Sequence, residues 1–157
     1  MDTNPNDLTT PDLLALLPHV FGTEPRNALA ILTFRRSWLA PAFTLALPAR
    51  ETETSSRRVA TEAIGAVCSA PGVDAVLLAI YTDRLARAVS RPFERLQWTV
   101  ASRLHGSGFH LADSFYVASN GWGSYLCDEP DCRLATPNPL ADLRTRTREL
   151  GEDIEGL

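Results

Sequence analysis

The chain has no lysine, few cysteines and no long apolar run. All 15 basic residues are arginine, and only 3 of the 157 residues are cysteine. An odd, small number of cysteines argues against a disulfide framework. No apolar stretch approaches the roughly 20 residues that a membrane-spanning helix needs. Because the first residues, MDTNPNDLTT, are polar and acidic and do not resemble a signal peptide, we expect a cytoplasmic protein that does not bind membranes.

The formal net charge of −4 opposes a general affinity for nucleic acid, which requires a basic face that releases counterions. Two groups of arginines are local exceptions: Arg57 and Arg58, and Arg84, Arg87, Arg91 and Arg95. They could hold phosphate groups, but charges at helical spacing usually form a solvated helix face. The sequence contains no P-loop, no G-x-G-x-x-G pattern and no H-E-x-x-H motif, so these nucleotide-binding and zinc-protease signatures are absent.

A chain of 157 residues can bury a real core, and we predict a single domain over residues 1–157 with flexible ends at 1–9 and 151–157. Four segments have helical apolar spacing or helix-start signals. The first has Thr10 as its N-cap and ends at Pro18 or Gly22, and the second has Ser55 or Ser56 as its N-cap and stops at Pro71 and Gly72. The third begins near Pro92, and the fourth follows Asn138 and Pro139.

Five segments have the pattern of strands. ALAILTF and AFTLALP are joined by RRSWLAP, which predicts a hairpin with a somewhat long connection. VDAVLLAI is continuously apolar, as in a strand covered on both faces. FHLADSFYVAS alternates, and the following Asn120-Gly121 predicts a type I′ hairpin. Two strand–helix–strand crossovers and two hairpins predict an α/β fold: one mixed sheet of about five strands with helices packed on its faces.

The strand VDAVLLAI ends in Tyr81, Thr82 and Asp83. In open α/β sheets, ligands gather outside the carboxyl ends of parallel strands. We therefore predict a ligand site at Tyr81, Asp83 and Arg84, in which Asp83 binds a hydroxyl or a cation, or acts as a base, and Arg84 binds an anion. The alternative is that Asp83 only caps the following turn.

Cys127 and Cys132 are separated by four residues in the segment SNGWGSYLCDEPDC. The spacing is compatible with a zinc knuckle, but a structural zinc site needs four ligands. The remaining ligands would have to come from Cys68, His19, His105 and His110. The alternatives are two small buried apolar groups at a corner of the fold and a reversible disulfide.

Aromatic residues on the same hairpin are candidates for contact with a protein partner. Trp122 and Tyr125 fall on opposite faces of a regular strand, so they cannot both stack on one ligand and one of them is expected in the core. Trp38 is a third candidate. Ser124 lies between Trp122 and Tyr125 in GWGSYL. This segment lacks the G-x-S-x-G elbow that presents a nucleophilic serine, so we do not expect Ser124 to be catalytic.

Three stretches resemble the DUF4192 family, an actinobacterial and phage family known only as a domain of unknown function. LLALLPHVFGTEPRNALAIL resembles its leucine-rich helix and following strand, LLAIYTD resembles its strand ending in Tyr-Thr-Asp, and GWGSYLCDEPDC resembles its Trp-x-Ser-Tyr-x-Cys segment. Members often have an arginine before that tryptophan, a second aromatic after it, a doubled cysteine and an aspartate in the second strand. Here Gly121, Gly123, Arg133 and Ala46 occupy these positions. The resemblance implies no established activity, ligand or catalytic residue.

We therefore expect a non-catalytic binding or regulatory module that presents Trp38, Trp122 and Tyr125 to a protein partner, with self-association left open. The first alternative is a small hydrolase- or transferase-like enzyme using Asp83. The second is a zinc-binding structural module using Cys127 and Cys132, and otherwise no cofactor is expected. A polar-floored pocket at Asp83 would favour the enzyme, whereas a flat or shallow apolar patch would favour the binding module.

Overall fold

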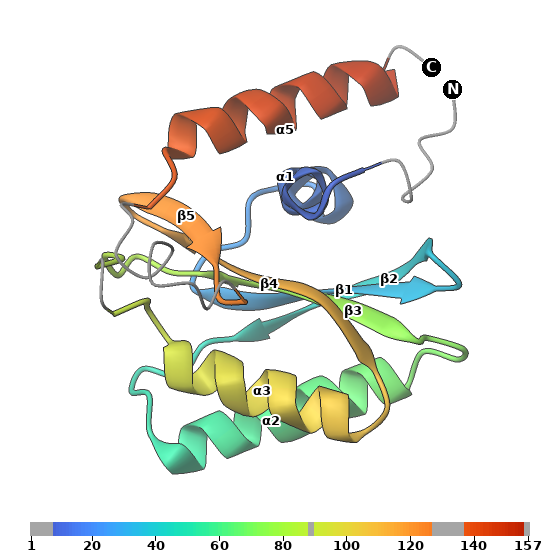
Figure 1. Ribbon diagram of the computed structural model, residues 1–157, viewed down its shortest axis with the longest axis vertical. Helices are drawn as coiled ribbons and strands as arrows, with labels where there is room; N and C mark the ends of the chain where they lie inside the picture. The colour runs from blue at the N-terminus through green and yellow to red at the C-terminus, as the bar shows by residue number, and fades with distance from the viewer. Residues whose placement is uncertain (1–7, 88–89, 127–136, 156–157) are drawn as a thin grey trace.

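The structure, a computed structural model, describes residues 8–87, 90–126 and 137–155, which form one five-stranded sheet between two helical layers (Figure 1). The elements are α1 (Thr10–Phe21), β1 (Ala28–Arg35), β2 (Trp38–Ala46), α2 (Glu53–Cys68), β3 (Ala75–Tyr81), α3 (Glu94–Gly106), β4 (His110–Ala118), β5 (Gly121–Ser124) and α5 (Leu140–Glu155). No helix among the described residues is both long enough and apolar enough to cross a bilayer. The α/β fold with one mixed sheet agrees with the sequence-based prediction.

The strand order is β2-β1-β3-β4-β5. β3 and β4 are parallel, and the other three neighbouring pairs are antiparallel. β3 therefore has a partner on each edge, and every residue from Val76 to Tyr81 is buried. This is the central strand that its continuous apolar sequence predicts.

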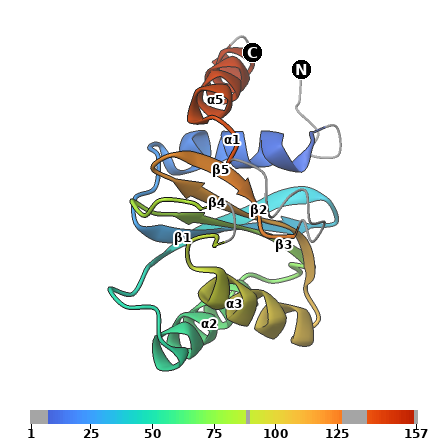
Figure 2. The ribbon, with the colours of Figure 1, turned by 60° about the vertical axis from the view of Figure 1, so that its left-hand side comes forward.

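The helices cover both faces of the sheet. α2 and α3 pack against one face, while α1 and α5 lie on the other, with α5 packed largely on α1 (Figure 2). Alternate residues of β3 contribute to the two cores: Leu78 and Ile80 face α2 and α3, and Leu77 and Ala79 face α1. The period-2 geometry of a strand thus supplies apolar side chains to both layers.

Three helices begin at residues other than those predicted. The N-cap of α1 is Thr9 rather than Thr10, and the N-cap of α2 is Thr52 rather than Ser55 or Ser56. In each case the threonine hydroxyl accepts a bond from the backbone N–H three residues later, and the side chain at that later position accepts one from the cap N–H. This reciprocal capping box satisfies two helix-end donors, which favours the earlier start.

The third of these helices, α3, begins at Glu94 rather than near Pro92, because Phe93 is left-handed at φ 55° and cannot belong to the helix. The Phe93 side chain forms no capping hydrogen bond with the helix. Instead, the carboxylate of Glu51, which precedes α2, accepts a bond of 3.1 Å from the N–H of Leu96. The α2 and α3 layer is therefore joined at the helix starts as well as along its apolar face.

The hairpin between β1 and β2 is tighter than predicted. Arg35 pairs with Trp38, so the turn contains only Arg36 and Ser37, both at positive φ (50° and 69°). Positive φ at both central residues suits a two-residue hairpin. Pro41 lies inside β2 rather than in the connection, and β2 tolerates it because it is an edge strand.

The hairpin between β4 and β5 forms as predicted, but its turn is displaced by one residue. Ala118 pairs with Gly121, so the turn residues are Ser119 and Asn120 and neither has positive φ. The side-chain amide of Asn120 instead exchanges two hydrogen bonds of 2.8 Å with the backbone of Ala86. This tertiary contact fixes Asn120 in a conformation that the type I′ prediction did not anticipate.

Two glycines have opposite roles in this fold. Gly121 has φ +156°, and a Cβ added there would lie 2.5 Å from Cβ of Pro137, whereas a Cβ on Gly65 within α2 would meet nothing within 4 Å. We expect Gly121→Ala to lower the free energy of unfolding by about 1–3 kcal/mol through overpacking. Gly65→Ala should raise it by roughly 0.5–1 kcal/mol by favouring the helix. Urea unfolding of both variants tests this, and an unchanged midpoint for Gly121→Ala would contradict the close packing at Pro137.

Candidate functional site

A cleft of about 510 Å³ lies at the carboxyl ends of β3 and β4. The loop before β1 and the start of α5 form its other walls. Its lining residues are Glu24, Pro25, Arg26, Asn27, Tyr81, Thr82, Asp83, Val117, Ala118, Ser119, Leu140 and Arg144. Two residues of the predicted ligand site, Tyr81 and Asp83, therefore line one cleft. The topology determines the position of the cleft. The parallel strands β3 and β4 both end on the side of the molecule where the antiparallel strand β1 begins.

Asp83 is held by Asn27 across the end of the sheet. The Asn27 side chain donates from Nδ2 to Oδ2 of Asp83 at 2.9 Å and accepts at Oδ1 from the Asp83 N–H at 3.2 Å. Asn27 has φ 46°, a left-handed conformation that asparagine adopts more readily than most residues. The N–H of Arg84 in the following turn bonds the Thr82 hydroxyl rather than Asp83, and the second carboxylate oxygen of Asp83 has no hydrogen-bond donor among the described residues.

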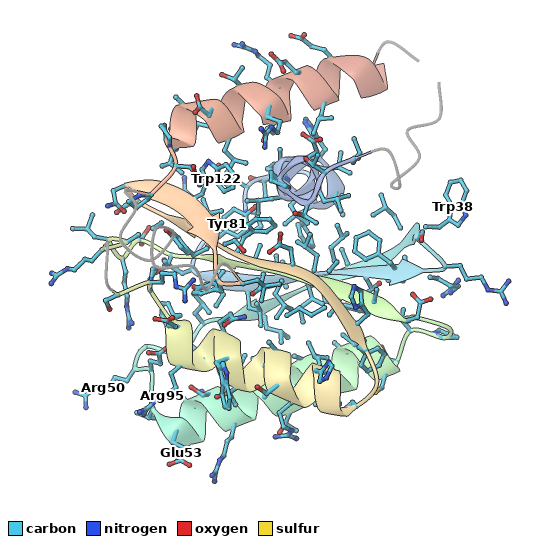
Figure 3. The ribbon with its side chains drawn as sticks, in the orientation of Figure 1. Trp38, Arg50, Glu53, Tyr81, Arg95 and Trp122 are labelled. Atoms are coloured by element: carbon cyan, nitrogen blue, oxygen red, sulfur yellow. The ribbon has the colours of Figure 1, made fainter. Side chains whose placement is uncertain are left out.

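Tyr81 lies at the floor of the cleft. It is only 3% exposed and lies between the sheet and the layer of α1 and α5 (Figure 3). Burial raises the pKa of its phenol above the ordinary value, and the nearby carboxylate of Glu24 raises that pKa further. No hydrogen bond joins its hydroxyl to any residue in the described part of the chain. The hydroxyl is not one of the buried, unpaired side-chain atoms among the described residues, so it is open to the cleft and available to water or a ligand.

A smaller chamber of about 100 Å³ continues from the cleft beneath the helices. It shares Glu24, Tyr81, Val117, Leu140 and Arg144 with the cleft. Its other lining residues are Leu14, Pro18, Leu143 and Thr147. The site therefore has a polar outer part and a mainly apolar inner part, which meet at Tyr81.

Charges of both signs line the outer part. Glu24 and Asp83 supply carboxylates, and Arg26 and Arg144 supply guanidinium groups. Within the described ranges, neither arginine forms a salt bridge and Glu24 forms none either. All four side chains are exposed, so the charges can meet a ligand without first breaking an internal ion pair.

Arg84, the third residue of the predicted ligand site, points away from the cleft. Its guanidinium carbon lies 4.0 Å from the ring centroid of Phe93, as in a cation–π contact. Its backbone carbonyl accepts a bond from the N–H of Ser119 at 3.3 Å. The cationic groups of the cleft are instead Arg26 and Arg144, which the sequence analysis did not identify.

The three aromatic residues considered for partner binding have different surroundings. Trp38 is 59% exposed at the tip of the β1–β2 hairpin (Figure 3), while Tyr125 is buried at 4%. Trp122 packs edge-on against Phe115 with ring centroids 6.1 Å apart. As the strand pattern predicts, Trp122 and Tyr125 lie on opposite faces of the sheet, Trp122 with α1 and Tyr125 with α3.

Tyr125 and Arg91 connect β5 to the start of α3. The Tyr125 hydroxyl donates to the carbonyl of Pro92, and Arg91 Nη1 donates to the carbonyls of Ser124 and Tyr125, each at 3.0 Å. Arg91 also pairs with Glu94. This arginine, one of the group considered for phosphate binding, is therefore committed to packing.

Ser124 has a similar structural role. Its hydroxyl donates to Asp113 at 2.8 Å, and the other oxygen of Asp113 accepts a bond of 2.6 Å from the hydroxyl of Thr10. These bonds connect β5, β4 and α1. No histidine of the described ranges forms a hydrogen bond with Ser124, so no Ser-His pair is assembled there.

The predicted metal ligands Cys127 and Cys132 lie outside the described residues. Cys68 is exposed at the end of α2, and His19 Nε2 lies 2.7 Å from the Thr147 carbonyl of α5. The described part of the chain contains no group of three or more His, Cys, Asp or Glu residues placed to hold a metal ion. The zinc site thus stays a prediction about a segment that the structure does not describe.

A family model described as a domain of unknown function, DUF4192, matches residues 11–148. The chain belongs to this family. The matched range contains the whole cleft, from Glu24 to Arg144, so the candidate site lies in the DUF4192 part of the chain. No curated protein and no solved structure matches the sequence.

We expect the three tyrosines of this DUF4192 member to ionise only when the protein unfolds. Burial raises the pKa of Tyr81, Tyr116 and Tyr125 above the ordinary 10.0, although Arg91 lowers that of Tyr116 in part. Because the tyrosines ionise at a lower pH in the unfolded chain than in the folded protein, their contribution to the stability of the folded state is complete below pH about 10. It falls as the pH rises further. We expect tyrosinate absorbance to stay flat through the ordinary range and to increase with the loss of circular dichroism at higher pH. A gradual titration of the folded protein at the value found in urea would contradict this.

Proposed function

We propose that this protein is a binding module that holds a small polar ligand in the cleft at the ends of β3 and β4. The observation that carries the proposal is the set of polar groups that converge on this cleft. Glu24, Asp83, Arg26 and Arg144 line it without a salt bridge among the described residues, and the Tyr81 hydroxyl has no protein hydrogen-bond partner there. A few convergent polar groups in a concave site are the arrangement expected of a ligand pocket.

Two further features support a small-molecule site. The cleft volume of about 510 Å³ lies in the usual range for ligand pockets, and the carboxyl ends of parallel strands are where such pockets occur. The cleft lining is also polar at Asp83, which argues against a flat apolar protein-binding patch and is the feature expected of the enzyme alternative. The structure therefore favours a ligand cleft over the predicted protein-binding face as the principal site.

Binding is favoured over catalysis because of the arrangement at Asp83. One of its carboxylate oxygens already accepts a bond from Asn27, and no other described side chain forms a hydrogen bond with it. A base or nucleophile is normally positioned by a second group that points at the reacting atom. The hydrolase- or transferase-like enzyme using Asp83 stays the alternative prediction.

Four probes of different charge test the proposal: acetate, inorganic phosphate, glycine and ribose. We expect at least one of them, at millimolar concentration, to raise the melting temperature, because a ligand that binds only the folded state stabilises it. Arg144→Gln and Tyr81→Phe should reduce that rise. Arg148→Gln is the matched control, because Arg148 is an exposed arginine of the same helix that does not line the cleft.

The proposal fails if neither these four probes nor leucine and its two singly charged analogues, 4-methylpentanoate and 3-methylbutylamine, bind the wild-type protein. It also fails if a probe stabilises wild type, Arg144→Gln and Tyr81→Phe equally, because the probe would then bind elsewhere. A rise that persists in Arg148→Gln and is lost in the two cleft variants supports the assignment.

A second candidate function is protein binding through the β1–β2 hairpin. Trp38 and Leu39 at its tip are 59% and 41% exposed, and β2 is an edge strand with one unpaired side. Exposed tryptophans often anchor protein interfaces. The partner would be a protein that accepts this aromatic tip.

Replacing Trp38 by serine separates an interface role from a structural one. We expect Trp38→Ser to change the free energy of unfolding by no more than about 0.5 kcal/mol, because the side chain is largely solvated. In a pull-down with the purified proteins as bait, the variant should lose a partner that the wild type retains. Identical sets of bound proteins for the two baits would argue against the hairpin as an interface.

The remaining sequence-based expectations stay predictions. They are a cytoplasmic location, an actinobacterial or phage origin, self-association, and a zinc-binding role for Cys127 and Cys132. None of them is needed for the ligand cleft, whose residues lie within the described ranges.

A further inference from the structure

The outer cleft and the inner chamber form one amphipathic site. Five residues line both spaces, and Tyr81 lies where they meet. The inner walls are supplied by α1, β4 and α5 through Leu14, Val117 and Leu143. A single ligand can therefore place a polar group in the outer cleft and an apolar group in the inner chamber.

The outer cleft favours a ligand that carries both charges. Its two carboxylates, on Glu24 and Asp83, balance its two guanidinium groups, on Arg26 and Arg144. A dianion such as phosphate would pair with the arginines but would also face both carboxylates, and like charges in a site repel a ligand. A zwitterion satisfies both kinds of group, with its anionic part toward the arginines and its cationic part toward the carboxylates.

The size of the inner chamber limits the apolar group. Its volume is about 100 Å³, while an apolar cavity of about 150 Å³ holds benzene. The chamber therefore takes a group smaller than a phenyl ring, such as a branched aliphatic group of about four carbon atoms. A ligand without such a group would leave the chamber empty.

We infer that the ligand class is a small zwitterion with a short aliphatic side group, of which a leucine-like α-amino acid is the simplest example. This inference rests on the proposed binding function of the same cleft. The carboxylate pairs with Arg26 and Arg144, the ammonium group pairs with Glu24 and Asp83, and the aliphatic group enters the inner chamber. The Tyr81 hydroxyl, placed between the two spaces, bonds the polar end of the ligand.

Isothermal titration calorimetry with four related probes tests each part of this assignment. L-leucine has all three groups, glycine lacks the aliphatic group, 4-methylpentanoate lacks the ammonium group and 3-methylbutylamine lacks the carboxylate. We expect leucine to bind at least about tenfold more tightly than glycine, because a buried aliphatic group contributes that much or more. It should also bind roughly tenfold more tightly than each singly charged probe, because each loses a charge-assisted contact.

A chamber-filling variant supplies an independent test. Leu140→Trp places a large ring at the boundary of the inner chamber, and Ala141→Trp is the matched control on the exposed neighbouring position. We expect Leu140→Trp to reduce the advantage of leucine over glycine to less than about threefold, because the chamber can then no longer take the aliphatic group. Ala141→Trp should leave that advantage unchanged. The probe series on the wild-type protein stands even if Leu140→Trp does not fold.

The outcomes separate this inference from the proposed function. Equal binding of glycine and leucine overturns the use of the inner chamber, and equal binding of leucine and 4-methylpentanoate or 3-methylbutylamine overturns the zwitterion. Tighter binding of inorganic phosphate than of any amino acid also overturns the inference, while an effect of Arg144→Gln on phosphate binding would leave the ligand cleft intact. If none of these probes nor acetate nor ribose binds, the proposed function fails and the inference fails with it.

Discussion

The fold depends on one constraint, the burial of β3 on both faces and along both edges. Because its side chains are apolar on both faces, neither face of β3 can be exposed to water. Helices therefore cover both faces, and β1 and β4 pair with its two edges. A parallel neighbour requires a crossover, which α3 supplies between β3 and β4. The antiparallel neighbour β1 therefore begins beside the carboxyl ends of β3 and β4, and the cleft lies where these strand ends meet.

The cleft exists because backbone pairing stops there and the side chains only partly replace it. Asn27 bonds Asp83 across the gap between β1 and β3, and Ser119 bonds the carbonyl of Arg84 between β4 and the loop after β3. These contacts hold the rim without filling the space above Tyr81. α5 packs mainly on α1, and Leu140 and Arg144 near its start line one side of the cleft.

Most of the fold could be predicted from sequence because it is encoded in local apolar patterns. The number of strands and the central position of β3 follow from such patterns, and the rule for strand ends directs attention to Tyr81 and Asp83, which line a cleft. Arg144, Glu24 and Asn27 could not be predicted as site residues, because only tertiary packing brings the start of α5 and the loop before β1 to β3. The same holds for Asn120, whose turn is fixed by Ala86.

Three of the four departures from the family pattern, Gly121, Gly123 and Ala46, lie outside the cleft, and the fourth, Arg133, lies outside the described residues. Gly121 accommodates Pro137, and a Cβ on Gly123 would lie 2.6 Å from the Tyr116 hydroxyl, so a side chain at either position requires a different arrangement of β5. Ala46 ends the edge strand β2. None of these three residues lines the cleft. The charged groups and the Tyr81 hydroxyl of the cleft therefore lie apart from Gly121, Gly123 and Ala46.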